Sequence, residues 1–162
     1  MRSLVAVARE TRCKVVATFG QWEAAAVGPQ AALGYATPLA DFAEDLDALA
    51  RLVGGLTRRP MWFLATGYSP LGCIRTACPA FDRRLPPVAD AYNAVARAVA
   101  AAHAPRVGFV ETRDIVGPMW DAAADWCHEG GKVLDAIATR VVAEVMADVA
   151  AWADDDGGGA WA

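Results

Sequence analysis

The sequence predicts a three-layer α/β/α fold with a short parallel sheet. Three apolar runs at residues 13–19, 61–66 and 106–110 are rich in β-branched or aromatic residues and lack alternation. Runs of that kind are typical of strands that are covered on both faces. Segments with helical periodicity separate them, and strands that alternate with helices form parallel sheets with helices on each face.

The first two expected helices have clear start and stop signals. One begins at a Thr-Pro pair at 37–38, a capping residue followed by proline, and ends at a Gly-Gly pair at 54–55. The other begins at a Pro-Pro pair at 86–87 and ends before Pro105, because proline interrupts a helix. Both carry apolar residues three and four positions apart, which predicts one buried face on each helix.

The last expected helix begins near Lys132 and has the most regular pattern in the chain. Its apolar residues form one stripe of Leu134, Ile137, Val141, Val145 and Val149. A further short helix is expected at residues 3–11. Together these elements predict a single domain at residues 1–152, followed by a disordered tail at 153–162.

Composition narrows the classes of function. Of 162 residues, 56% are hydrophobic and 21% are charged, which suits a compact fold. The net charge of −4 gives no basic surface for nucleic acid, and no apolar run is long enough to span a membrane. The four cysteines include no Cys-x-x-Cys pair, so we expect no metal site, and no motif indicates a cofactor. We find no convincing signal peptide, and the cysteines do not identify the cellular compartment.

Ligands of parallel α/β sheets bind beyond the carboxyl ends of the strands, so the loops there are the informative ones. The third loop contains Asp125 and His128, an Asp-x-x-His pair just before the last helix. A carboxylate that orients a neutral imidazole is the arrangement of a hydrolase general base. Chance alone gives such a pair roughly one time in six here, so it needs support from its context.

The first two loops hold the other candidate residues. Gly20 follows the first strand and precedes Gln21 and Trp22. A glycine there permits close approach of the backbone to a ligand, and exposed amides can form part of an oxyanion hole. The alternative is a tight turn with Trp22 packed over the core. Ser69 lies in the loop after the second strand, in the sequence ATGYSPLG.

These motifs together resemble the SGNH (GDSL-type) esterase superfamily over about residues 13–150. The Gly-x-Trp turn at Gly20 and the loop from Thr66 to Ser69 are similar to its PC-esterase branch, which includes glycan O-acetyltransferases. The resemblance implies an SGNH/flavodoxin-like sheet without its first strand. It implies that His128 is the general base and Asp125 its partner. It also implies oxyanion or substrate contacts from Gly20, Gln21, Trp22 and Ser69, and an acyl ester substrate, such as an O-acylated carbohydrate.

One departure from the family affects function directly. The family's nucleophile is the serine of a Gly-Asp-Ser motif, and this sequence has no such motif and only two serines, Ser3 and Ser69. A base without a nucleophile cannot form a serine ester. Three explanations stay open: the nucleophile lies upstream in a longer protein, the protein binds without catalysing, or Ser69 has been recruited.

The rival function is a non-catalytic carbohydrate-binding or protein-interaction module on the same scaffold. Tryptophans near the strand ends could stack on sugar rings, and a partner chain could cover the apolar edge that a missing strand leaves. A flavodoxin-like nucleotide binder is the weaker third option, because no glycine-rich phosphate loop follows the first visible strand.

Overall fold

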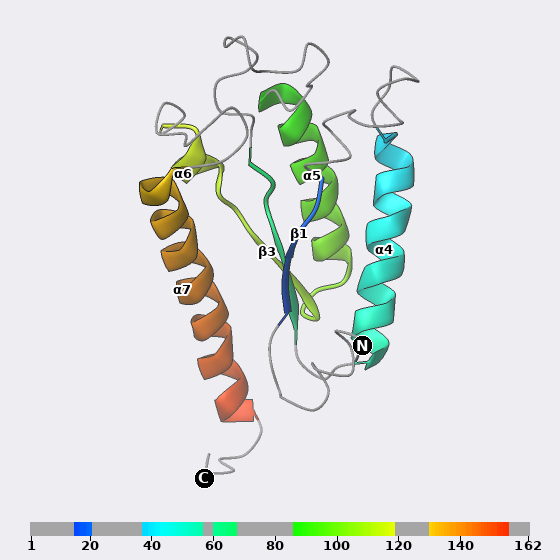
Figure 1. Ribbon diagram of the computed structural model, residues 1–162. Coiled ribbons are helices and arrows are strands. Elements are labelled where there is room, and N and C mark those ends of the chain that lie inside the picture. The colour runs from blue at the N-terminus through cyan, green and yellow to red at the C-terminus, as the bar shows by residue number, and fades with distance from the viewer. Residues whose placement is uncertain (1–14, 21–36, 57–59, 68–85, 119–129, 156–162) are drawn as a thin grey trace, which may run out of the picture.

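The protein is a mixed α/β domain with a three-stranded parallel sheet (Figure 1). The computed structural model describes residues 15–20, 37–56, 60–67, 86–118 and 130–155. The strands are β1 (Val15–Thr18), β2 (Met61–Leu64) and β3 (Val107–Val110), in the order β1-β2-β3. The three predicted strands and their parallel direction are therefore confirmed, with ends that differ from the prediction by at most two residues.

Helices flank the sheet on two sides (Figure 1). α4 and α5 lie on one side and α7 on the other, and the helices begin at the end of the sheet where the strands finish. This arrangement follows from the parallel connections, in which each helix returns the chain to the start of the next strand. The described helices are α4 (Leu39–Leu56), α5 (Pro86–Ala102), α6 (Arg113–Val116) and α7 (Gly131–Asp155).

Several predicted helix ends were wrong. α4 continues through the glycine pair at 54–55 to Leu56. Its first helical hydrogen bond runs from Phe42 N to Pro38 O at 3.0 Å, so Pro38, and not Thr37, precedes the helix. α6 was not predicted. α7 reaches Asp155, so the first three residues of the predicted tail are helical. The expected helix at 3–11 and the rest of the tail lie outside the described residues.

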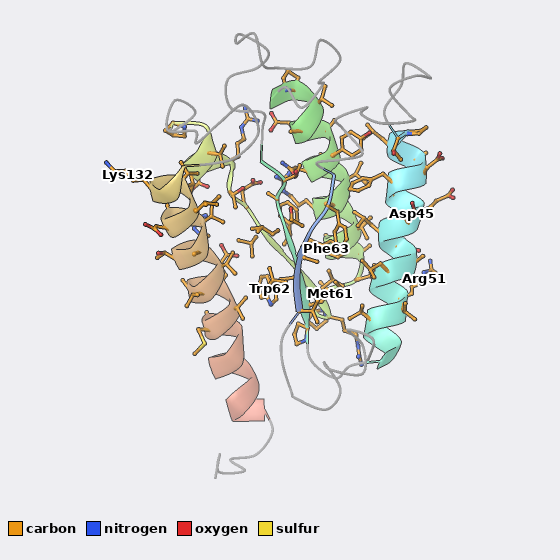
Figure 2. All side chains as sticks on the ribbon, viewed as in Figure 1. Asp45, Arg51, Met61, Trp62, Phe63 and Lys132 are labelled. Carbon is orange, nitrogen blue, oxygen red and sulfur yellow. The ribbon has the colours of Figure 1, made fainter. Side chains whose placement is uncertain are left out.

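The main core lies between the sheet and the α4–α5 pair. Met61 and Phe63 of β2 point toward this side in Figure 2, and Trp62 points the opposite way, as the alternation of a strand requires. Alanines from both helices are buried in the same cluster, which lets the helices approach closely. The buried members of this core are Phe42, Leu46, Ala50, Val53, Met61, Phe63, Tyr92, Ala96, Ala100 and Val107.

The other face of the sheet is covered less completely, which contradicts the expectation of strands buried on both faces. Val16 of β1 is 39% exposed, and burial alternates along β1 and β2. The reason is that α7 packs beside β3 at the far side of the sheet (Figure 1). Of the predicted stripe of α7, Ile137, Val141 and Val145 are partly buried as expected, whereas Leu134 is 53% exposed and Val133 is buried in its place.

Where the strands begin, far from their carboxyl ends, two side chains from α4 and the end of α5 form a hydrogen bond. His103 follows α5, and its Nε2 lies 2.7 Å from Asp47 Oδ1 of α4. This hydrogen bond, with help from Arg51, lowers the pKa of Asp47 below its ordinary value of 3.8. The contact joins the end of α5 to the middle of α4. Among the described residues, no helix is both long and apolar enough to cross a membrane.

Candidate functional site

The carboxyl ends of the three strands meet at one edge of the sheet (Figure 1). Gly20 follows β1 by two residues, Thr66 follows β2 by two, and Glu111 follows β3 directly. Ligands of parallel sheets bind at this edge. It holds two polar sites, one buried beside β1 and β2 and one open beside β3.

Gly20 occupies a position that only glycine adopts without strain. Its φ is +95°, in the left-handed region that residues with a Cβ avoid. A Cβ built there would lie 3.2 Å from Tyr92 Cβ and 3.5 Å from both Phe42 Cζ and Thr66 Cγ2. The turn after β1 is thus packed tightly against α4, α5 and the end of β2, and the close approach that Gly20 permits is to these protein side chains.

Asn93 fixes the backbone at the end of β2. Thr66 N donates to Asn93 Oδ1 at 2.8 Å, and Asn93 Nδ2 donates to Thr66 O at 3.1 Å. Both residues are buried. The amide of Asn93 therefore replaces the ladder partner that the Thr66 peptide no longer has beyond the strand, which satisfies both buried backbone groups.

The backbone of Thr66 is fully hydrogen-bonded, but its side-chain hydroxyl is not. Thr66 is 3% exposed, and its Oγ1 has no hydrogen-bond partner among residues 15–20, 37–56, 60–67, 86–118 and 130–155. We call Gly20, Thr66 and Asn93 the buried site. Nearby, Tyr92 Oη donates to Thr37 O, which ties α5 to the chain two residues before α4. The buried site is therefore held by contacts from α4, α5 and both strand ends.

The second site is an open pocket of about 620 Å³ at the end of β3. Its walls come from the turn after β3, from α6 and from the first half of α7. We call it the β3 pocket, and the residues that line it are Glu111, Arg113, Asp114, Gly117, Pro118 and Arg140.

Ion pairs organise the β3 pocket. Arg140 Nη2 lies 2.7 Å from Asp114 Oδ2, and its Nη1 donates to Glu111 O at 3.3 Å, which joins α7 to the end of β3. The hydrogen bond from Arg140 lowers the pKa of Asp114, and the same bond raises the pKa of Arg140. Arg97 pairs with Glu111, and Arg113 pairs with Asp90. The three arginines are thus each matched by a carboxylate.

The side chain of Glu111 also holds the backbone at the start of α6. Its Oε1 accepts hydrogen bonds from Thr112 N at 3.0 Å and from Arg113 N at 3.1 Å. Because Glu111 is held by these amides and by Arg97, its role is to shape the turn. Asp114 is 58% exposed at its side chain, so its carboxylate is the accessible acceptor of the pocket.

Of the predicted site residues, the structure places only Gly20, and it brings Gly20 beside Thr66. Gln21, Trp22, Ser69, Asp125 and His128 lie outside the described residues. The flanks of the segment that carries Asp125 and His128 are described. Pro118 precedes it and lines the β3 pocket, and Gly130 follows it, where its carbonyl accepts from Val133 N at the start of α7.

Sequence reasoning missed Asn93 and the charged residues of the β3 pocket. Asn93 had a signal, because it is a polar residue on the apolar face of α5, between Ala89 and Ala96. Glu111 also had one, as a carboxylate directly after a buried strand. Arg140 had none, since an arginine within a long helix is usually solvated.

Comparisons with known proteins do not assign the chain to a family. A scan against protein-family models found no match to the chain, and a search of curated proteins found no similar sequence.

Proposed function

We propose that this domain is SGNH-like and acts on acyl esters, with O-acylated carbohydrates as the substrate class. In this proposal the pair Asp125 and His128 supplies the general base at the carboxyl edge of the sheet. The proposal makes the domain an esterase or an O-acetyl-transferring domain, and it interprets the sheet as the later part of an SGNH/flavodoxin-like sheet.

The observation that carries the proposal is that the carboxyl ends of the strands, and the loops that follow them, lie together at one edge of the sheet. Gly20 has a left-handed φ and contacts the end of β2, so the first two loops start side by side. The segment with Asp125 and His128 leaves from Pro118 and returns at Gly130, beside the same edge. A base on that segment and an oxyanion site at the first two loops are therefore compatible with one reaction centre.

The proposed reaction needs a hydroxyl nucleophile. His128 takes the proton of a serine hydroxyl while the serine oxygen bonds to the acyl carbon, and Asp125 stabilises the resulting imidazolium. The oxyanion is stabilised at the Gly20 turn. The bond between the acyl carbon and the sugar oxygen then breaks, and that oxygen takes the proton from His128. Water or a second sugar hydroxyl finally accepts the acyl group. Ser69, three residues after Thr66, is the first serine to test.

The test is turnover of 4-nitrophenyl acetate by the wild type and by His128→Ala. Loss of a general base lowers the rate by about 10²- to 10⁴-fold, so we expect a loss of that size. His103→Ala is the matched control, because the chain has two histidines and His103 pairs with Asp47 at the opposite end of the sheet. Equal turnover in all three proteins would contradict the assignment of His128.

A second test concerns the nucleophile. If Ser69 is the nucleophile, Ser69→Ala abolishes turnover and the wild type accumulates an acetyl group on Ser69 that mass spectrometry detects. Turnover that survives in Ser69→Ala and is lost in His128→Ala would assign the base and exclude Ser69. The absence of turnover in every variant would contradict the enzyme proposal.

The alternative function is a non-catalytic carbohydrate-binding or protein-interaction module, and two observations favour it. The β3 pocket is open and presents both donors and acceptors, the pattern that sugar hydroxyls match. β1 is an edge strand of the described sheet with Val16 exposed, so an extended partner chain could pair with it. This alternative predicts glycan or partner binding that His128→Ala retains in full.

A further inference from the structure

We propose that the Thr66 hydroxyl donates a hydrogen bond to the acyl oxygen of a ligand bound at the ends of β1 and β2. This inference rests on the proposed function and assigns it an oxyanion-binding residue. The starting observation is that Thr66 is 3% exposed and that its Oγ1 makes no hydrogen bond within the part of the chain that the structure describes. Buried hydroxyls in proteins are nearly always hydrogen-bonded, so an exception needs a physical reason.

The first argument is the rigidity of the residue. The side chain of Asn93 holds both the N–H and the C=O of Thr66, at 2.8 and 3.1 Å. Ala65 N also donates to Val110 O at 3.0 Å, so the chain before Thr66 is still paired with β3. A hydroxyl on a backbone fixed in this way does not need to be ordered when a ligand arrives, which is the condition for effective electrostatic stabilisation.

The second argument is location. Thr66 follows the central strand of the described sheet, and parallel sheets bind ligands beyond the ends of their strands. The methyl group of Thr66 faces the turn at Gly20, where a Cβ would lie 3.5 Å from Thr66 Cγ2. Because Gly20 has no side chain, the turn after β1 packs directly against the Thr66 methyl group. The methyl is therefore used in packing, whereas the hydroxyl makes no hydrogen bond to any of the described residues.

The third argument is chemical. A threonine hydroxyl has one donor hydrogen and needs an acceptor when it is buried. The amide oxygen of Asn93 accepts from Thr66 N, and the Thr66 hydroxyl bonds to no acceptor among the described residues. A carbonyl oxygen, and more strongly the oxyanion that replaces it during acyl transfer, supplies the missing acceptor. The expected ligand class is therefore an acyl ester or a tetrahedral anion that mimics its intermediate.

The experiment compares binding of ethyl methylphosphonate, a stable tetrahedral anion, to the wild type, Thr66→Ser and Thr66→Val by NMR titration. Valine keeps the shape and removes the hydroxyl, whereas serine keeps the hydroxyl. We expect Thr66→Val to bind about tenfold to a hundredfold more weakly and Thr66→Ser to stay within about threefold of the wild type. The stability of Thr66→Val in urea should be equal to that of the wild type or higher, because the hydroxyl has no partner to lose.

Trp62→Phe is the matched control, because Trp62 Nε1 is the other buried side-chain atom that has no partner among the described residues. Trp62 lies within β2 and away from the strand ends, so its variant should bind the phosphonate as the wild type does. Equal binding by the wild type and Thr66→Val would overturn the inference, as would no binding by the wild type. A marked loss of stability in Thr66→Val would also overturn it, since it would reveal a partner within the protein.

Turnover separates this inference from the proposed function. Ester turnover that is lost in His128→Ala and unchanged in Thr66→Val would support the function and overturn the role of Thr66. Phosphonate binding that depends on Thr66, in a protein without turnover, would support the binding role and contradict the enzyme.

Discussion

The buried site and the β3 pocket lie at the same edge of one sheet but use polar groups in opposite ways. In the buried site, one neutral amide, that of Asn93, satisfies two backbone groups, and the Thr66 hydroxyl bonds to none of the residues that the structure describes. In the β3 pocket, charged side chains pair with one another in contact with solvent, and Asp114 is 58% exposed.

The difference shows how burial decides the value of a polar contact. A buried donor or acceptor that loses its partner keeps its full desolvation cost, whereas an exposed one exchanges its partner for water. The buried site should therefore control stability and geometry. The β3 pocket, whose charged contacts are exposed to solvent, should contribute less to stability.

The largest effect is expected from Asn93→Leu in the buried site. Leucine is similar in size but leaves Thr66 N and Thr66 O buried without partners, so we expect a loss of about 2–5 kcal/mol in the free energy of unfolding. Urea denaturation measures it. Thr139→Ala is the control, because it removes a bond from an exposed hydroxyl to Asp135 O and should change stability by less than about 0.5 kcal/mol. Similar losses in the two variants would contradict the claim that burial decides how much a polar contact contributes to stability.

The next effect concerns the backbone at Gly20. Gly20→Ala combines a left-handed φ with a Cβ contact of 3.2 Å, and we expect it to cost about 1–3 kcal/mol in the free energy of unfolding. Gly131→Ala is the matched control, since a Cβ at the start of α7 has no atom within 4 Å. It should change stability by less than about 0.5 kcal/mol in either direction. Thermal or urea unfolding that ranks Gly131→Ala as the more damaging change would refute the close approach at Gly20.

The smallest effect is expected in the β3 pocket, from Asp114→Asn. Arg140 lowers the pKa of Asp114 below its ordinary value of 3.8, so the pair stabilises the fold above that pH. The stabilisation is lost as the pH falls through the lowered pKa. The difference in unfolding free energy between wild type and variant should therefore be constant near neutral pH and disappear in acid. A difference that grows as the pH falls below 3.8 would mean that the pair is not the cause.

The sequence predicted the framework of the fold better than the site. The strand at β2 was found because Met61 and its neighbours form an apolar run, and α5 was found because proline marks both of its ends. The end of α4 was missed because the glycine pair at 54–55 stays helical. α6 was missed because its four residues are too few to produce a periodic pattern.

The site was harder because its contacts join residues that are distant in sequence. Asn93 binds a peptide 27 positions away, and Arg140 reaches Asp114 across 26 positions. Periodicity predicts which face of a helix is buried, but it does not predict which backbone group a polar residue on that face will meet. Gly20 was identified because its signal is local, a glycine just past a predicted strand, and the structure adds that its φ is positive.

The most direct test of the central claim is release of acetate from an O-acetylated oligosaccharide, followed by ¹H NMR for the wild type, His128→Ala and His103→Ala. The account predicts release by the wild type and by His103→Ala, and a loss of about 10²-fold or more in His128→Ala. Acetate release at the same rate in His128→Ala and the wild type, or none in any of the three proteins, would contradict it.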